Sequence, residues 1–102
     1  MKLITKAIEK VLVKYPLYSQ DGKGKEAQVL VKFFNPAGRG TWYVTEAEKQ
    51  SDGDWLFFGL VDLYEREYGY FKLSDLQNVR LPFGLGIERD MYFKPTKLGN
   101  LA

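Results

Sequence analysis

Histidine and cysteine are both absent from the 102 residues of this chain. Without cysteine the chain forms no disulfide and offers no thiolate to a metal. Without histidine it lacks the commonest general base and the commonest metal ligand of proteins. Any metal would have to be held by carboxylate and carbonyl oxygens, which suit Mg²⁺, Ca²⁺ or Mn²⁺. The common catalytic mechanisms that use histidine or cysteine are therefore excluded, so we expect a binding protein without a cofactor rather than an enzyme.

A large net charge and a long apolar run are missing as well. The 15 basic and 13 acidic residues leave a net charge of +2. That charge is too small to indicate a nucleic-acid binder from composition, and it disfavours a DNA mimic. The longest apolar run, residues 55–61, is too short to span a bilayer, and charges interrupt the first apolar residues. We expect one domain, residues 1–102, in a cytoplasmic protein that does not contact a membrane.

The first segment has the period of a helix. Thr5 is placed to cap its amino end, and Pro16 disfavours helical backbone at the residue before it. A polar loop follows over residues 19–26. The predicted helix spans residues 4–14. Its apolar stripe, which Tyr15 extends, consists of Ile4, Ala7, Ile8, Val11, Leu12 and Tyr15.

From residue 28 onward the apolar period changes from 3.6 to 2, which indicates strands. Short polar turns at 35–40 and 50–54 favour an antiparallel meander, and the stretch 55–63 is apolar on both faces, as in a central strand. Alternation would place Val29 with Phe33, and Glu46 with Val44, on shared faces. The expected strands are 28–34, 41–46, 55–63 and 68–73, with 87–93 as a possible fifth.

The carboxyl-terminal third is expected to contain one short helix. Ser74 and Gln77 have the spacing of a capping box for a helix over residues 74–79. A rigid loop at 80–86 follows, which would either cover the far face of the sheet or leave it partly exposed, and the tail from residue 97 is expected to be loose. The predicted fold class is α+β: an antiparallel meander sheet of four or five strands, packed by the amino-terminal helix.

Several aromatic residues stand beside a lysine or an arginine. Proteins that bind single-stranded nucleic acid stack bases on aromatic rings of a sheet and hold phosphates with nearby cations. The alternative is that the Phe and Trp residues form the core, with Tyr residues at its edge and lysines in solvent. The candidate binding residues are Lys32, Arg39, Tyr43, Tyr70, Lys72, Tyr92 and Lys94.

A second candidate site is built from carboxylates. Glu88 and Asp90 would share one face of the fifth strand, and Glu46 and Asp62 on other strands could join them. The predicted hydrolase would use Glu46, Glu88 and Asp90 with a divalent cation. The alternative is an exposed strand face with cross-strand ion pairs. The glycines and lysines of residues 22–25 do not form a phosphate loop, because the spacing is wrong and no helix follows.

The order of several motifs resembles a bacterial family called Domain of Unknown Function 2958. Its members are small proteins often encoded on plasmids, integrative elements and phages, so the resemblance implies a mobile-element setting. It brings no activity and no catalytic residue. The motifs that carry the resemblance are residues 2–6, 31–36, 41–46, 56–59, 67–71, 87–90 and 92–95.

Three functions remain in order of preference. The first is a binding module that contacts another protein through a sheet face and the Arg39 loop. The second is binding of single-stranded nucleic acid, and the third is the divalent-cation hydrolase. An uncovered edge strand could pair in a dimer, but the sequence does not set the oligomeric state.

Overall fold

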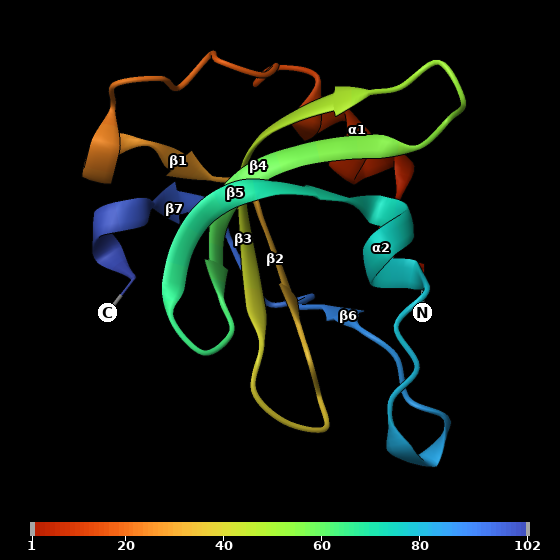
Figure 1. Ribbon diagram of the computed structural model, residues 1–102. Helices are drawn as coiled ribbons and strands as arrows, with labels where there is room; N and C mark the ends of the chain where they lie inside the picture. The colour runs from red at the N-terminus through yellow and green to blue at the C-terminus, as the bar shows by residue number, and fades with distance from the viewer. Residues whose placement is uncertain (1, 102) are drawn as a thin grey trace.

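A five-stranded antiparallel sheet organises the chain, and its strands follow the order β5-β4-β3-β2-β6. The computed structural model in Figure 1 describes residues 2–101. The α+β class and the meander of the four longer strands confirm the prediction from the sequence. The strands are β2 (Val31–Phe34), β3 (Thr41–Lys49), β4 (Trp55–Asp62), β5 (Arg66–Lys72) and β6 (Glu88–Arg89).

The amino-terminal helix α1 spans Lys6–Leu12 and is shorter than predicted. Its cap is the predicted one, since Thr5 Oγ1 accepts a hydrogen bond from the Ile8 amide at 3.3 Å. Leu12 is fully buried, whereas Ala7, which was expected on the apolar stripe, is exposed. The helix therefore contacts the sheet through a narrower stripe than the sequence indicated.

The second helix, α2 (Leu73–Gln77), has a different cap from the one predicted. The Asp75 carboxylate accepts from the Lys72 amide at 3.2 Å, whereas the Ser74 hydroxyl donates to Asp54 Oδ2 at 2.6 Å. Asp54 Oδ1 also accepts from the amides of Ser74 and Trp55. The predicted Ser74–Gln77 capping box is wrong, because a carboxylate from the β3–β4 turn satisfies the amides at the start of α2.

One face of the sheet carries an aromatic core. Phe33 and Phe57 are fully buried, with ring centroids 5.8 Å apart, and Phe57 also lies 5.5 Å from Phe71 and 6.5 Å from Trp55. Burying each Phe side chain contributes roughly 1.5–3 kcal/mol to folding. The interpretation of the Phe and Trp blocks as packing residues is confirmed for this face.

The segment predicted as one strand over 28–34 is broken at Leu30. Its first part, β1 (Gln28–Val29), leaves the sheet and pairs antiparallel with β7 (Thr96–Lys97). Val29 then packs with Leu60 and Leu98 in a second apolar cluster, away from Phe33. Because of the break, Val29 lies on the opposite face from Phe33, so the prediction from strand alternation that they share a face is wrong.

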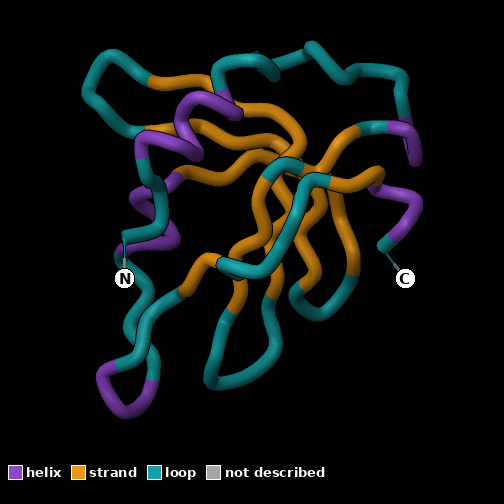
Figure 2. Tube along the Cα trace, turned by 180° about the vertical axis from the view of Figure 1, so that it is seen from behind, coloured by secondary structure: helices purple, strands orange, loops and turns teal. Residues whose placement is uncertain are grey.

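The carboxyl-terminal segment is not loose, contrary to the prediction. The Leu98 amide donates to the Ala27 carbonyl at 2.8 Å, and Leu98 is buried in the short 3₁₀ helix η3 (Leu98–Asn100). Figure 1 shows β1 and β7 on one side of the sheet and both α-helices on the other, and Figure 2 shows the same arrangement from behind. The segment covers Leu60 on the sheet's second face.

The predicted fifth strand over 87–93 is reduced to the two residues of β6, which pair with β2. The loop before it contains the 3₁₀ turn η2 (Pro82–Gly84) and projects from the body of the protein at the lower right of Figure 1. Phe83 at its tip is 98% exposed. The loop at 80–86 therefore does not cover the second face of the sheet, and this face is partly exposed, which is one of the two predicted alternatives.

The elements of residues 2–101 form one domain. The radius of gyration of the Cα atoms is 13.0 Å, which matches the value of about 13 Å for a single domain of 100 residues. Among residues 2–101, no helix has the length and apolar character needed to cross a bilayer.

We expect Asp54→Ala to lower the free energy of unfolding by about 1 kcal/mol at pH 7, because the start of α2 loses its cap. Hydrogen bonding from Ser74 lowers the pKa of Asp54 below its ordinary value. A lowered pKa stabilises the fold above about pH 4, and that contribution is lost as the pH falls through the folded value. Urea unfolding at pH 7 and pH 3 would measure the difference. Asp54→Asn keeps an acceptor that does not titrate, so its stability relative to Asp54→Ala should stay constant with pH.

Candidate functional site

The second face of the sheet carries two rows of side chains near its β5 edge. In antiparallel sheets, directly opposed residues point to the same side. The register places Phe58 of β4 between Glu46 of β3 and Tyr70 of β5. The next row places Leu60 beside Tyr68 on β5. These rows gather aromatic side chains on a face that the helices do not cover.

A β-bulge directs Glu46 to this face. The β3–β4 register shifts between Val44 and Glu46, so Thr45 is an extra residue in β3, and its hydroxyl donates to the Phe58 carbonyl at 3.1 Å. Gly59 lies opposite, where an added Cβ would overlap the backbone of Tyr43, so only glycine fits. The expectation that Glu46 shares a face with Val44 is wrong, because a bulge re-aims the side chains that follow it.

The Glu46 carboxylate holds the loop that follows α1. It is only 3% exposed, and its two oxygens accept from the amides of Tyr18 at 2.8 Å and Gln20 at 2.9 Å. Hydrogen bonds to an ionised acceptor are about twice as strong as neutral ones. The buried carboxylate thus fixes the backbone of this loop against β3.

The buried Gln20 side chain extends the connection to β1. Its Nε2 donates to the carbonyls of Gln28 at 2.8 Å and Thr45 at 2.6 Å, and its Oε1 accepts from the Gln28 amide at 2.7 Å. The NH₂ group and the carbonyl oxygen of this side-chain amide both have hydrogen-bond partners, as burial requires. Gln20 joins the loop to two strands at once.

Tyr18 lies in this loop with a φ angle of +71°, in the left-handed region that a bulky residue rarely occupies. Such a conformation costs on the order of 1–3 kcal/mol and persists where the surroundings impose it, often at functional sites. The hydrogen bonds at Glu46 and Gln20 impose it here. The Tyr18 side chain is 66% exposed, so the strain positions a ring in solvent rather than in the core.

Tyr18, Phe58, Tyr68 and Tyr70 form what we call the tyrosine patch. The Phe58 ring stacks at 12° on Tyr68 with centroids 6.3 Å apart, and it meets Tyr70 at 59° and 4.9 Å. Tyr68 is 59% exposed and Tyr70 is 51% exposed. Clustered exposed aromatic rings on a rigid support are typical of an interaction surface.

The electrostatic surroundings of the tyrosine patch are negative around Tyr70. Hydrogen bonding with Tyr18 raises the pKa of Tyr70, and so do partial desolvation and the nearby carboxylates of Glu46 and Asp21. A raised pKa keeps the phenol protonated. The patch therefore offers the neutral Tyr70 hydroxyl group and electron-rich ring faces beside carboxylates.

Two of the four basic residues of the predicted binding set, Lys32 and Arg39, form ion pairs with acidic side chains. Lys32 lies 3.7 Å from Asp90, and Arg39 lies 3.2 Å from Asp62. Asp62 also binds Arg66 at 3.2 Å, and hydrogen bonding from Arg39 is the main cause of its lowered pKa. The charges of Lys32 and Arg39 are thus largely balanced within the chain.

Some of the predicted residues come together, but not in one site. Lys32 and Tyr92 line one hollow of about 280 Å³, and Lys32 and Arg39 line another of about 400 Å³. Tyr43 is half-buried against the cluster of Val29, Leu60 and Leu98. The three remaining residues are exposed: Tyr70 and Lys72 on β5, and Lys94 in the loop after β6.

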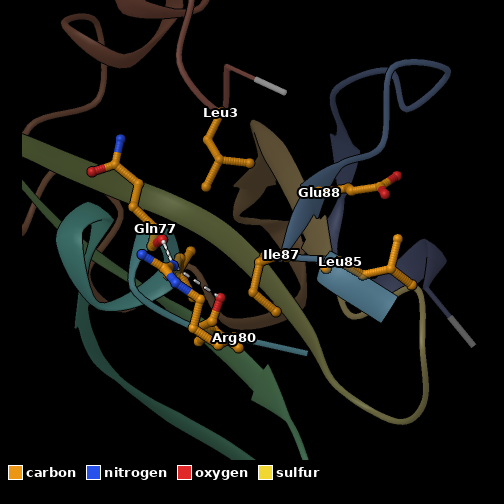
Figure 3. A pocket seen from close by; sticks show the side chains of 10 residues that line it. Leu3, Gln77, Arg80, Leu85, Ile87 and Glu88 are labelled. Carbon is orange, nitrogen blue, oxygen red and sulfur yellow. Dashed lines mark hydrogen bonds between the residues drawn. The ribbon is translucent and has the colours of Figure 1, made fainter. Parts of the chain in front are cut away.

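A further hollow, of about 620 Å³, lies between α2, the loop after it and Leu3 (Figure 3). Arg80 Nη1 donates to the carbonyls of Gln77 at 3.0 Å and Val79 at 3.4 Å. In Figure 3 the Glu88 carboxylate points away from the Arg80 guanidinium. This hollow does not bring together the groups that an acid–base reaction needs.

The three carboxylates of the predicted hydrolase are not assembled. Glu88 pairs in register with Phe34, which is opposite Thr41, and Glu46 lies five residues further along β3, or about 15 Å at the rise of a strand. Among residues 2–101, no group of three or more acidic side chains could hold a metal ion. The geometry offers no support for a divalent-cation site at these residues.

Sequence reasoning missed three members of the tyrosine patch. Tyr68 precedes Tyr70 by two residues, so strand alternation could have paired them. Phe58 lies in the stretch that was predicted to be apolar on both faces, but it was not assigned to a site. Tyr18 gave no signal, because it reaches the patch through a loop conformation and a buried contact with Glu46.

A sequence model of the family described as "Protein of unknown function (DUF2958)" matches residues 3–100. The chain belongs to this family. No curated protein and no solved structure shows significant similarity to it. In this DUF2958 protein the tyrosine patch is the surface whose geometry indicates a function.

We expect Glu46→Gln to lower the free energy of unfolding by about 1–3 kcal/mol, because one buried backbone amide then faces an amide nitrogen instead of an oxygen. The amides of Tyr18 and Gln20 should also exchange hydrogen faster. Urea unfolding and hydrogen exchange would measure both effects. The matched control is Glu48→Gln, an exposed glutamate of the same strand, and a loss as large in the control would contradict the assignment.

We expect the Tyr70 phenol to titrate above its ordinary pKa of about 10, and Tyr18→Phe to lower that pKa by removing the hydroxyl that bonds it. Ring carbon chemical shifts followed by NMR through alkaline pH would report the titration. Tyr64→Phe, a change at an exposed residue outside the patch, serves as the control. An unchanged Tyr70 titration in Tyr18→Phe would show that the two hydroxyl groups are not coupled.

Proposed function

We propose that this DUF2958 protein is a non-enzymatic binding module that holds another protein on the tyrosine patch. The observation that carries the proposal is a cluster of exposed aromatic rings, one of which, Tyr18, stands on a strained backbone held by buried hydrogen bonds. In the mobile-element setting that the resemblance implies, the partner would be a protein of the element or of its host. The proposal keeps the expected sheet face but moves the contact from the Arg39 loop to the β5 edge.

The composition of the patch suits a protein interface. Tyrosine is enriched at binding hot spots because it adds contact area and a hydroxyl while losing little conformational entropy. The patch is also preorganised, since Glu46 and Gln20 fix the Tyr18 loop before a partner arrives. Preorganisation raises affinity by lowering the entropy cost of binding.

Single-stranded nucleic acid is the second candidate, because bases could also stack on these rings. It would need cations that can contact phosphates. Lys32 and Arg39 are paired with Asp90 and Asp62, which leaves Lys72 and Lys94 as the exposed basic residues of the predicted set. The carboxylate of Asp21 beside the patch would repel a phosphate. The charges therefore favour a polypeptide over a polynucleotide.

A peptide-display selection against the full chain tests the proposal without knowledge of the natural partner. We expect selected peptides whose binding is weakened at least tenfold by Tyr70→Ala, the loss typical of a hot-spot residue. Tyr64→Ala, at an exposed tyrosine outside the patch, should leave binding unchanged. Calorimetry with synthetic versions of the selected peptides would give the affinities.

Labelled single-stranded oligonucleotides provide the competing measurement. Binding that depends on Tyr70 and falls steeply with salt would favour the nucleic-acid alternative, since phosphate contacts release counterions. Selected peptides that bind the wild-type chain and Tyr70→Ala equally would reject the tyrosine patch as the binding surface.

A further inference from the structure

The rings of the tyrosine patch are arranged around Phe58. Phe58 and Tyr68 lie nearly parallel, at 12°, and Tyr70 is inclined by 59° to Phe58. Tyr18 adds a fourth ring, and Glu46 fixes the backbone that carries it by accepting from the Tyr18 amide. Ring faces carry the negative part of the aromatic quadrupole and attract cations placed over them. The patch therefore presents electron-rich surfaces at more than one inclination.

The charges nearest the patch reinforce this preference. The carboxylates of Glu46 and Asp21 act electrostatically on the Tyr70 hydroxyl. Both oxygens of Glu46 are occupied by backbone amides, so its charge contributes without offering a further strong acceptor. Asp21 is exposed, and its amide donates to the Tyr18 carbonyl at 3.2 Å, so it lies at the loop side of the patch. A ligand on the patch can meet the Asp21 carboxylate on that side.

Lys72 is the cation that follows Tyr70 on the same face of β5. It pairs in register with Leu56 rather than with a ring of the patch, and its charge acts on Asp54 at the start of α2. Asp54 and Asp75 lie at that end of the strand and balance it. Lys72 therefore limits the negative region on one side without reversing it.

We propose that the tyrosine patch receives the guanidinium group of an arginine in an extended segment of the partner protein, with its plane against the rings of Tyr68 or Tyr70 and its N–H groups directed to Asp21. This inference rests on the proposed function and names the chemistry that the partner must present. Arginine fits better than lysine because its guanidinium is planar, stacks on aromatic faces and is more weakly hydrated. An anionic ligand would meet the carboxylates instead.

The test uses the full chain and two small probes, N-acetyl-arginine amide and N-acetyl-citrulline amide. Citrulline has the shape of arginine without its charge, so the pair isolates the cation. In NMR titrations we expect the arginine probe to shift the ring resonances of Tyr18, Tyr68 and Tyr70. It should bind about two- to fivefold more tightly than the citrulline probe, the range of an exposed cation–π contact.

Variants assign the binding to the patch. Asp21→Asn should reduce the preference for arginine, and Tyr70→Ala should remove the shifts at the remaining rings. Tyr68→Ala serves as a second ring deletion if Tyr70→Ala fails to fold, which the dispersion of the amide spectrum would reveal. Tyr64→Ala should bind both probes as the wild-type chain does.

The outcomes separate this inference from the proposed function. Equal binding of the two probes, or shifts confined to residues outside the patch, would overturn the arginine assignment. If Tyr70-dependent peptides from the selection still bind and lack arginine, the proposed function stands and only the arginine is wrong. If neither the probes nor the selected peptides perturb the patch, both proposals fall.

Discussion

The second face of the sheet depends on the hydrogen bonds that the buried Glu46 carboxylate accepts. The bulge at Thr45 and the absence of a side chain at Gly59 bring Glu46 to that face. Glu46 then holds the loop after α1 by two amides, and Gln20 connects the loop to β1. Glu46 and Gln20 together thus join strand β3 to the loop after α1 and to β1.

The two faces of the sheet use aromatic residues in different ways. On the first face, Phe33, Phe57 and Phe71 exclude water and stabilise the fold. On the second face, the rings of Tyr68 and Tyr70 stay in solvent, supported by Phe58. Neighbouring residues of one strand therefore lie in the core or in solvent, so side chains of the tyrosine patch can be changed without emptying the core.

Strand alternation and helical period predicted the meander, α1 and the packing role of Phe33 and Phe57, because these depend on local pattern. The features that build the candidate site depend on other information. The bulge at Thr45 adds one residue without changing the pattern of residue types, and the strands β1 and β7 are too short to show a period. The positive φ of Tyr18 follows from tertiary hydrogen bonds, which no local rule contains.

The pairing of β1 with β7 is expected to form after the hairpins of the main sheet. These strands join regions near opposite ends of the chain, and closing so long a loop is slow compared with forming a hairpin. During synthesis, the hairpins of β2 to β5 can form before residues 96–98 have left the ribosome. The Leu98 side chain cannot pack on Leu60 until then, and β1, which anchors Gln20, has no strand partner. The second face of the sheet, which carries the tyrosine patch, is therefore completed after the hairpins.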